Sequence, residues 1–375
     1  MRISADSGCV ILGETKTSCF RPQGHGPYAD RNSTQDEPSE RFPAVPPLLY
    51  TDRLSHDFQP LIKQLRSGDA RTLARAISVV ENRSPGSADL LKALFPQTGH
   101  ARILGLTGAP GAGKSTLVDQ LAKHYRKGNR TVGIIAVDPT SPYTGGAILG
   151  DRIRMQDHFS DPGIYIRSMA TRGSLGGLAR ATADVATVMD ASGRDLIMIE
   201  TVGVGQDEVD IVRLADITVV ILVPGMGDDV QSIKAGIMEI ADIFVINKSD
   251  REGAERVERE IRALQSLAIR NDHFRGDHWV PPIVKTVASE GIGVGDLVTA
   301  IAEYEAYLQK ENLVLQRNIE NWQERLIDML RDALLEKARE QMEGGNVARY
   351  AAEVAAHKRD PYTLVEEIVG KLGKG

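Results

Sequence analysis

The stretch GAPGAGKS, residues 108–115, decides the fold class of this chain. It meets the phosphate-loop pattern G-x-x-x-x-G-K-[ST] at Gly108, Gly113, Lys114 and Ser115. Apolar residues before it predict a strand, and apolar spacing after it predicts a helix. Such a loop turns backbone N–H groups and the positive end of the helix towards an anion. A glycine-rich turn with a chance lysine is the alternative, but it accounts for neither the strand nor the helix.

The loop residues have separate expected roles. Gly111 and Ala112 belong to the same phosphate-binding turn. Lys114 is expected to reach the β- and γ-phosphates, and the Ser115 hydroxyl is expected to ligate Mg²⁺. Thr116, the next residue, is expected to donate to the α-phosphate.

A second loop, NKSD at residues 247–250, follows another apolar strand and fits a guanine base. Guanine presents two donors on one edge, and the Asp250 carboxylate can accept both. Adenine would leave that carboxylate unpaired, at a cost of about 1–3 kcal/mol. Asn247 is expected to tie this loop to the phosphate loop, and the Lys248 stem is expected to cover one face of the base.

A further contact with guanine is expected at Val287 and Ala288, where a strand ends and a backbone N–H can meet the base oxygen. The alternative for NKSD is a polar turn after a buried strand. Its place about 130 residues after the phosphate loop, among alternating strands and helices, favours the guanine interpretation. The two loops together predict GTP and GDP as the bound nucleotides.

Strand-like runs recur along the chain with helical segments between most of them, and several runs are continuously apolar, as in strands covered on both faces. The pattern predicts an α/β fold: a doubly wound, mostly parallel sheet with ligands at the carboxyl ends of its strands. The predicted strands are 102–107, 132–138, 164–168, 195–200, 217–223, 243–247 and 283–287.

The predicted organisation has four parts. Residues 1–45 are rich in Gly, Pro, Ser and charge and are interpreted as a disordered tail. Residues 46–100 form a helical N-terminal extension, 101–302 the P-loop GTPase domain, and 303–375 a helical C-terminal dimerisation arm.

Composition limits the possible partners and the compartment. The net charge is −6, which gives no reason to expect nucleic acid as a partner. The longest apolar run, 217–223, is far too short to span a membrane. The two cysteines, Cys9 and Cys19, lie in the tail, so a reducing, cytoplasmic location is expected.

Three acidic residues fall where a metal bound to phosphates is expected. Asp138 and Glu200 each end a predicted strand, and Asp151 ends a glycine-rich stretch. Gly203 follows Glu200 by three residues, a spacing typical of a backbone N–H that senses the γ-phosphate. Each acid alone is more often a solvent contact or a helix cap. Three of them in such positions in a chain with a phosphate loop favour a Mg²⁺ site.

These segments also carry a family resemblance. DPTSPYTGGAILGDRIRM (138–155), IRSMATRGSLGGLA (166–179) and ETVGVGQDE (200–208) resemble the MeaB/ArgK/MMAA family, GTPases associated with adenosylcobalamin-dependent acyl-CoA mutases. The resemblance runs from about residue 65 to beyond 300. It implies a chaperone that gates cofactor loading and protects the mutase.

The resemblance also implies roles for residues. Asp138 would belong to the Mg²⁺ site, Asp151 would position or activate water, and Glu200 would be the Walker-B-type acid. The segment PGMGDDVQSIKAG (224–236) resembles a family switch loop that communicates with the mutase, with Lys234 as a charge contact.

One position departs from small GTPases. Val204 follows Gly203, where Ras-like enzymes have a glutamine that orients the attacking water. Gln206 lies two residues further on and need not substitute for it. Hydrolysis is therefore expected to be slow without a partner.

The C-terminal arm predicts an interface. Residues 303–342 are strongly helical, and a second apolar stripe (Ile327, Leu330, Leu334) lies beside the main one. Two apolar faces call for two partners, the protein's own body and a second subunit, and family members are typically dimers through these helices. A helix packed only on its own domain is the alternative. The main stripe, at 4-3-4-3-4 spacing, is Leu315, Ile319, Trp322, Leu326, Met329 and Ala333.

Three other roles compete with that of a mutase chaperone. A nickel-type metallochaperone GTPase needs soft or imidazole ligands near the nucleotide, whereas His124 and His158 are isolated and no cysteine lies outside the tail. An arginine/ornithine transport-system kinase, a label that the family has carried, lacks the kinase motifs. A structural oligomer with a vestigial site would not keep Lys114 and Glu200. Methylmalonyl-CoA, isobutyryl-CoA and ethylmalonyl-CoA mutases all stay open as the client.

Overall fold

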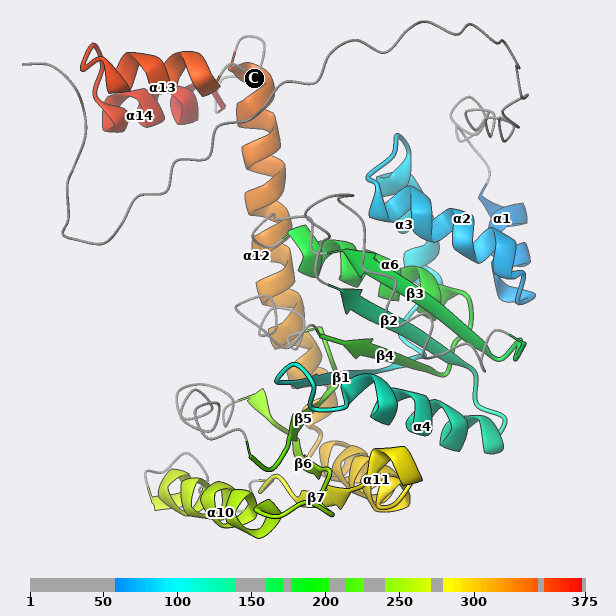
Figure 1. The fold of residues 1–375 in the computed structure, drawn as a ribbon. Coiled ribbons are helices and arrows are strands. Elements are labelled where there is room, and N and C mark those ends of the chain that lie inside the picture. The colour runs from blue at the N-terminus through cyan, green and yellow to red at the C-terminus, as the bar shows by residue number, and fades with distance from the viewer. Residues whose placement is uncertain are drawn as a thin grey trace, which may run out of the picture. The chain divides into compact units, whose positions relative to one another are not determined.

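Seven parallel strands form one sheet, in the order β3-β2-β4-β1-β5-β6-β7 (Figure 1). The structure is a computed structural model that describes residues 58–138, 160–170, 177–201, 214–225, 240–270, 279–342 and 347–372. Every predicted strand is present. Their bounds are β1 Arg102–Gly108, β2 Val132–Asp138, β3 Ile164–Ala170, β4 Leu196–Glu200, β5 Ile217–Leu222, β6 Ile243–Asn247 and β7 Ile283–Thr286.

The central strands are apolar along their whole length because helices cover both faces of the sheet. Every residue of β4, β5 and β6 is buried. On one face, α4 (Lys114–Lys127) and α11 (Val294–Lys310) pack on the strands. On the other face lie α6 (Gly177–Ala191) and α10 (Ala254–Arg270). This confirms the doubly wound α/β fold, and the register is parallel at every pair of neighbouring strands that the structure describes.

The N-terminal extension is helical, as predicted, and it is part of the core. The helices are α1 (Gln59–Arg66), α2 (Ala70–Glu81) and α3 (Ser87–Leu94), followed by the short helix η1 (Phe95–Gln97). Asp69 caps α2 by accepting from the backbone N–H groups of the first turn. The apolar side of these helices packs with α6 and with β2 and β4 in one cluster.

Aspartates organise the amino end of the sheet, and the sequence patterns did not single them out. A carboxylate that accepts from backbone N–H groups satisfies donors that parallel strands leave unpaired at their starts. These carboxylates cap the amino ends of the strands. The phosphate loop lies at the opposite edge, where the strands have their carboxyl ends. The contacts are Asp190 with Gly99, His100 and Ala101, Asp195 with Thr131, Asp216 with Ile103, and Asp242 with Thr218.

The predicted arm is not one helix. α11 ends at Lys310, Asn312 takes a left-handed conformation (φ 55°), and α12 (Leu313–Gln341) begins in a new direction. The boundary placed between 302 and 303 lies inside α11, whose Tyr304 and Leu308 are buried in the same cluster as the strands. The division of the chain into domains stays a prediction, and α12 is the part of the predicted arm that follows the break at Asn312.

The apolar stripe of α12 does not form one face. The Trp322 ring packs edge-on against Phe95 of the same chain at 5.5 Å, whereas Leu315 and Leu326 are 69% and 56% exposed. Ion pairs also hold this helix to α6, among them Arg325 with Asp184 at 3.6 Å. The helix thus has one side against the body and an apolar side that the described residues leave exposed.

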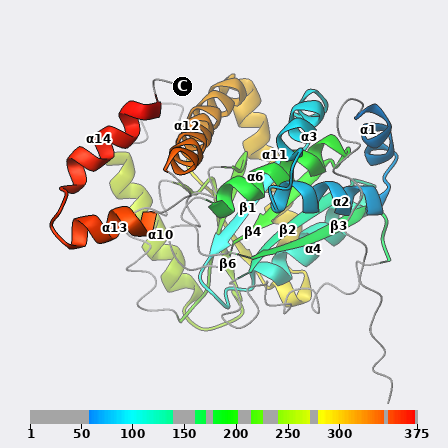
Figure 2. The ribbon, with the colours of Figure 1, turned by 90° about the horizontal axis from the view of Figure 1, so that it is seen from above.

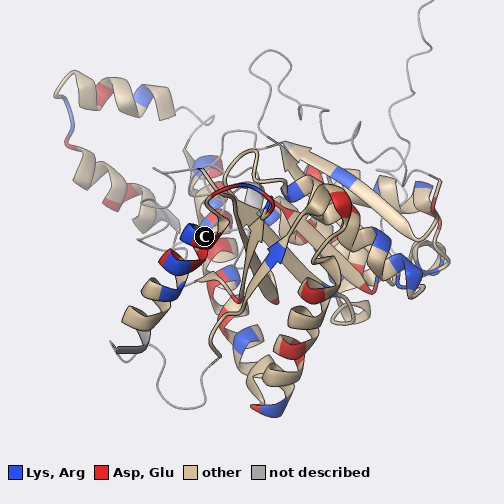
Figure 3. Ribbon diagram, turned by 60° about the horizontal axis from the view of Figure 1, so that its bottom comes forward, with Lys and Arg blue, Asp and Glu red and all other residues tan. Residues whose placement is uncertain are grey.

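Two short helices complete the chain, α13 (Val347–Ala355) and α14 (Pro361–Leu372), and α14 contacts α12 (Figure 2). Acidic and basic residues are mixed along the helices (Figure 3). Within the described ranges, no helix combines the length and the apolar character needed to cross a bilayer.

Candidate functional site

The phosphate loop connects β1 to α4 at the carboxyl end of the sheet, as predicted. Two of its glycines are required by close approach to neighbouring strands. Gly108 has φ 145°, and a Cβ there would lie 2.1 Å from the carbonyl oxygen of Ile221 in β5. Gly113 has φ 90°, and a Cβ there would lie 2.4 Å from Nδ2 of Asn247. The loop is therefore pressed against the ends of β5 and β6 and can only be built with glycine at these positions.

The lysine of the motif folds back over its own loop. Lys114 is the first residue of α4 and is buried, and its Nζ donates to the carbonyl oxygens of Gly108 at 2.7 Å and Ala109 at 3.1 Å. The cation is thus held against the loop that is shaped for an anion. A lysine at the start of a helix in this position can neutralise phosphate charge.

Ser115 and Glu200 meet beside the loop. The Ser115 hydroxyl donates to Glu200 Oε1 at 2.6 Å, and Glu200 is buried at the end of β4. The contact depends on register, because Glu200 lies opposite Leu106 of β1, two residues before the loop. A hydroxyl and a carboxylate are oxygen donors, the class that Mg²⁺ prefers. This donor chemistry fits the predicted metal site.

The other acidic candidates are placed only in part. Asp138 is the last residue of β2 and therefore lies at the same edge of the sheet, but its side chain is outside the described part of the chain. Asp151 and Gly203 lie outside the described residues, as do Val204 and Lys234. Among the described residues, no group of three or more His, Cys, Asp or Glu could hold a metal ion.

A threonine pair, which the motifs did not predict, adjoins this site. Thr201 directly follows Glu200, and its hydroxyl donates to the Thr107 hydroxyl at 3.1 Å. The Thr201 N–H also donates to the Leu106 carbonyl. Both threonines are buried, so they fix the end of β4 against the start of the phosphate loop. Their position after a strand-ending acid and before the loop was the available signal.

One side chain joins the base loop to the phosphate loop. Asn247 Nδ2 donates to the Ala112 carbonyl at 2.8 Å. Its Oδ1 accepts from the Thr286 hydroxyl and from the Ala288 N–H, each at 3.1 Å. The contact between the two loops that the sequence predicted is therefore present, and Asn247 also binds the end of β7. Three segments far apart in the sequence meet at this buried amide.

The Lys248 side chain makes a second link between the loops. Lys248 has a left-handed backbone (φ 55°), and its Nζ donates to the Gly111 carbonyl at 2.7 Å. Its stem therefore spans from the base loop to the phosphate loop. Asp250 lies in the same turn and is exposed, and Thr116 lies in the first turn of α4.

The expected base contact through Val287 and Ala288 stays a prediction, and both N–H groups have partners inside the protein in this structure. The Val287 N–H donates to the Ile292 carbonyl at 3.1 Å, and the Ala288 N–H is engaged by Asn247. Both donors are therefore already used inside the protein. The turn η4 (Ala288–Glu290) still lies at the same edge of the sheet, where it supports the base loop through Asn247.

Comparison with known proteins finds relatives that match most of the chain. A family model described as "Methylmalonyl Co-A mutase-associated GTPase MeaB" matches residues 73–343. A protein of Pyrococcus abyssi is 47% identical over 314 residues, which is 83% of this chain and 96% of that protein. GTPase ArgK of Escherichia coli is 38% identical over 251 residues, 66% of this chain and 76% of that protein.

A more distant relative and a solved structure agree with this. "Methylmalonic aciduria type A homolog, mitochondrial" of Caenorhabditis elegans is 32% identical over 273 residues, 68% of each chain. The crystal structure titled "LAO/AO transport system kinase" has a TM-score of 0.63 and 26% identity, and the match covers 87% of this chain and all of that one.

Proposed function

The chain belongs to the MeaB family of methylmalonyl-CoA mutase-associated GTPases, and we propose that it is a GTP-dependent chaperone of an adenosylcobalamin-dependent acyl-CoA mutase. The protein is a GTPase and binds guanine nucleotide. The proposal concerns the biological role of this GTPase activity. Its strongest support is the match to the mutase-associated family over residues 73–343, which extends well beyond the phosphate loop that many nucleotide-binding proteins share.

The proposed nucleotide site uses the residues gathered at the carboxyl edge of the sheet. Lys114 binds the β- and γ-phosphates, and Thr116 donates to the α-phosphate. Asp250 accepts the two donors of guanine, while the Lys248 stem covers the base. Support comes from the Asn247 side chain, which holds the base loop and the phosphate loop at one spacing.

The proposed Mg²⁺ site comprises Ser115, Glu200, Asp138 and Asp151. The hydroxyl and the carboxylate in contact at 2.6 Å fit such an ion, and Asp138 ends the strand next to β4. When bound, the ion would offset the negative charge of the phosphates. Ser115 and Glu200 would hold its oxygen shell, and Asp151 would position water.

Turnover is proposed to be slow in the isolated protein. Val204 stands where a water-orienting glutamine is found in Ras-like enzymes, so the chain relies on another residue or on a partner to orient water. Slow turnover suits a protein that reports its nucleotide state to a client. Gly203 and the segments 151–180 and 224–236 are the proposed parts that respond to the γ-phosphate, and Lys234 is the proposed contact with the mutase.

The protein is further proposed to be a homodimer through α12. Its outward side exposes large apolar side chains: Leu326 is 56% exposed, Ile327 64% and Leu330 60%. A helix that binds its own body on one side and exposes leucine and isoleucine on the other has a surface suited to a second subunit. Trp322, which packs on Phe95, belongs to the side that faces the body.

The proposal is tested by cofactor transfer. Methylmalonyl-CoA mutase free of cofactor is mixed with adenosylcobalamin and the protein, together with GTP, GDP or a non-hydrolysable GTP analogue, and the formation of active mutase is followed. The expected result is a loading rate that differs between the GTP and GDP forms. The same assay is repeated with isobutyryl-CoA mutase and ethylmalonyl-CoA mutase. If the loading rate of all three mutases is unchanged by the nucleotide and by the protein, the chaperone function is rejected and the GTPase has another client.

A further inference from the structure

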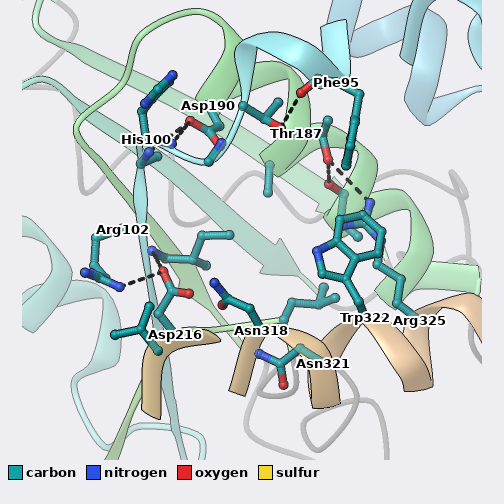
Figure 4. Close-up of a pocket in the computed structure, with 18 residues that line it drawn as sticks. Phe95, His100, Arg102, Thr187, Asp190, Asp216, Asn318, Asn321, Trp322 and Arg325 are labelled. Atoms are coloured by element: carbon teal, nitrogen blue, oxygen red, sulfur yellow. Dashed lines mark hydrogen bonds and ion pairs between the residues drawn. The ribbon is translucent and has the colours of Figure 1, made fainter. Parts of the chain in front are cut away.

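A cavity of about 440 Å³ between α12, α6 and the start of β1 shows how this chain treats its buried carboxylates (Figure 4). Asp190 accepts there from the N–H groups of Gly99 and Ala101 at 2.6 and 2.9 Å. Asp216 accepts from the Ile103 N–H at 2.8 Å. Buried polar groups are normally bonded in this way, so a buried polar atom that lacks a partner calls for an explanation.

The Ser168 hydroxyl departs from this pattern. Ser168 lies in β3, and its Oγ atom is buried. Within the described part of the chain, this Oγ has no hydrogen-bond partner. A buried hydroxyl without a partner lowers stability, whereas alanine at the same place would carry no such cost. A serine here is therefore best explained by a water or an ion that binds its hydroxyl.

The alternation of side chains along a strand shows which face of the sheet Ser168 occupies. Alternate residues of a strand point to the same face. Ile164 and Ile166 of β3 pack in the apolar cluster that includes α4, and Ser168 follows them with the same period. Met198 of β4 belongs to that cluster as well, and Glu200 lies two residues after it. Ser168 and Glu200 are therefore both on the face that α4 covers.

The strand register places these two residues in one row across the sheet. Ala136 of β2 is paired with Ser168 on one side and with Glu200 on the other. Neighbouring strands lie about 4.8 Å apart, so the Cα atoms of Ser168 and Glu200 are roughly 10 Å apart. Ala136 has only a methyl group, so it leaves space between the two longer side chains. No direct hydrogen bond joins them, since the Ser168 Oγ has none in the described part.

A hydrated Mg²⁺ ion has a size and a chemistry that suit this row. Mg²⁺ binds oxygen ligands at about 2.1 Å and usually keeps several of its waters. A bound water makes a hydrogen bond of about 2.8 Å, so a ligand oxygen and a hydroxyl on opposite sides of such an ion lie roughly 7 Å apart. The Glu200 carboxylate, which accepts from the Ser115 hydroxyl at 2.6 Å, is the oxygen ligand on one side. Ser168 is the hydroxyl on the other.

We propose that Ser168 is a positioning residue of the GTPase site, whose hydroxyl binds a water of the Mg²⁺ ion and so holds the ion against Glu200 and Ser115. This role rests on the proposed Mg²⁺ site. Groups that bind a metal's own ligands orient those ligands and raise the affinity for the metal. The placement agrees with Asp138, another residue of the proposed Mg²⁺ site, because Asp138 ends β2, the strand between β3 and β4.

A structural water that has nothing to do with the metal is the alternative. Such a water would bind the Ser168 hydroxyl in the nucleotide-free protein too, so loss of the hydroxyl would lower stability and leave Mg²⁺ binding unchanged. A hydroxyl that serves the metal predicts a different pair of results. Its loss should weaken Mg²⁺ binding, and it should not lower the stability of the nucleotide-free protein, where the hydroxyl has no such partner.

Calorimetry of the full chain with a non-hydrolysable GTP analogue, over a range of Mg²⁺ concentrations, tests this role. The Mg²⁺ concentration that gives half of the gain in affinity should rise about tenfold in Ser168→Ala, because loss of a group that holds a metal's ligands typically weakens metal binding by about 10–100-fold. Ser168→Thr keeps the hydroxyl and should stay near the unmodified value. The urea midpoint of nucleotide-free Ser168→Ala should be unchanged or higher.

Two further variants separate the possible outcomes. Ser192→Ala is the matched control, because Ser192 is also buried but donates to the Met189 carbonyl at 2.6 Å, so its loss should lower the urea midpoint and spare the Mg²⁺ dependence. Glu200→Gln should lose the Mg²⁺ dependence, and if it does not, the proposed metal site is wrong and the role of Ser168 fails with it. If Glu200→Gln loses it but Ser168→Ala keeps the unmodified dependence, the role of Ser168 alone is overturned. No mutase enters these measurements, so they do not depend on the proposed client.

Discussion

Asn247 Nδ2 lies 2.8 Å from the carbonyl oxygen of Ala112, and this hydrogen bond joins the loop that follows β6 to the loop that precedes α4. The same amide accepts from Thr286 and from Ala288. One buried side chain therefore sets the spacing between the part of the site that binds the base and the part that binds phosphate. Because the nucleotide spans both parts, this spacing bears on guanine binding as much as on folding.

Replacing that side chain should damage both properties. Asn247→Ala leaves a carbonyl, a hydroxyl and an N–H group without their partner in a buried place, which costs about 3 kcal/mol of unfolding free energy. Urea unfolding measures this loss, and calorimetry should show weaker GTP binding. Asn82→Ala is the matched control, since that amide is exposed and donates to the Ser78 carbonyl oxygen. If Asn247→Ala binds GTP like the unmodified protein, the loops do not depend on this link.

Nucleotide choice should follow Asp250. Its carboxylate is expected to accept two donors of guanine, so GTP and GDP bind well and ATP binds poorly. Asp250→Asn should shift preference to xanthosine nucleotides, because xanthine presents an acceptor where guanine presents a donor. Calorimetry with GTP, ATP and XTP checks this. Equal affinity of the unmodified protein for ATP and GTP would refute the assignment of this loop to guanine.

A buried carboxyl at the amino end of the sheet should make stability depend on pH. Burial raises the pKa of Asp242 to about 6, although Arg317, Thr218 and Tyr304 bind the carboxylate. The folded pKa lies above the unfolded value of 3.8, so the folded state gains from protonation. This contribution is fully present below pH 3.8 and is lost as the pH rises through 6, and it amounts to about 3 kcal/mol.

Asp242→Asn isolates this effect, because asparagine keeps an acceptor and does not titrate. We expect the unfolding free energy of the unmodified protein to rise relative to that of this variant as the pH falls from 7 to 4. Asp89→Asn, at an exposed ion pair of α3 with Lys92, is the control. A difference that stays constant over this range would show that Asp242 is ionised throughout.

The outward side of α12 should control the oligomeric state. Leu326→Asp and Leu330→Asp place charge on a side that is 56% and 60% exposed at these residues. In a dimer that charge would be buried without a partner, at a cost of several kcal/mol. Sedimentation should show a monomer that still binds GTP, whereas Glu336→Lys on the same helix should leave the dimer intact. An unmodified protein that sediments as a monomer at micromolar concentration would remove the dimer from the account.

Much of the fold was predictable because parallel strands covered on both faces are continuous apolar runs. β5 (ITVVIL) has no polar alternation, and its neighbours share this character. The break between α11 and α12 was not predictable, since Glu311 and Asn312 interrupt no apolar stripe. The sequence also did not show whether Trp322 faces the body or solvent, because its apolar stripe borders two sides of the helix. The contact with Phe95 decides that it faces the body.

The site was predictable where a local motif carries it. The phosphate loop and Asn247 were found from sequence spacing, since each belongs to a short pattern at the end of a strand. The contact of Ser115 with Glu200 was expected only as a shared metal site, because it needs the register of β1 and β4. The Thr107–Thr201 bond and the aspartate caps have no periodic signal, and the positions of the two threonines beside the motifs do not show that their hydroxyls meet.

The measurement that tests the central claim most directly is GTP turnover of the full protein with and without methylmalonyl-CoA mutase and its relatives. The account predicts slow turnover alone and a clear acceleration by one mutase, because a bound client can help to orient the attacking water where Val204 replaces the glutamine of Ras-like enzymes. Lys114→Ala should be inactive in both conditions, and Lys234→Ala should keep the basal rate but lose the acceleration. If no adenosylcobalamin-dependent mutase changes turnover, the claim that this GTPase serves such a mutase is contradicted.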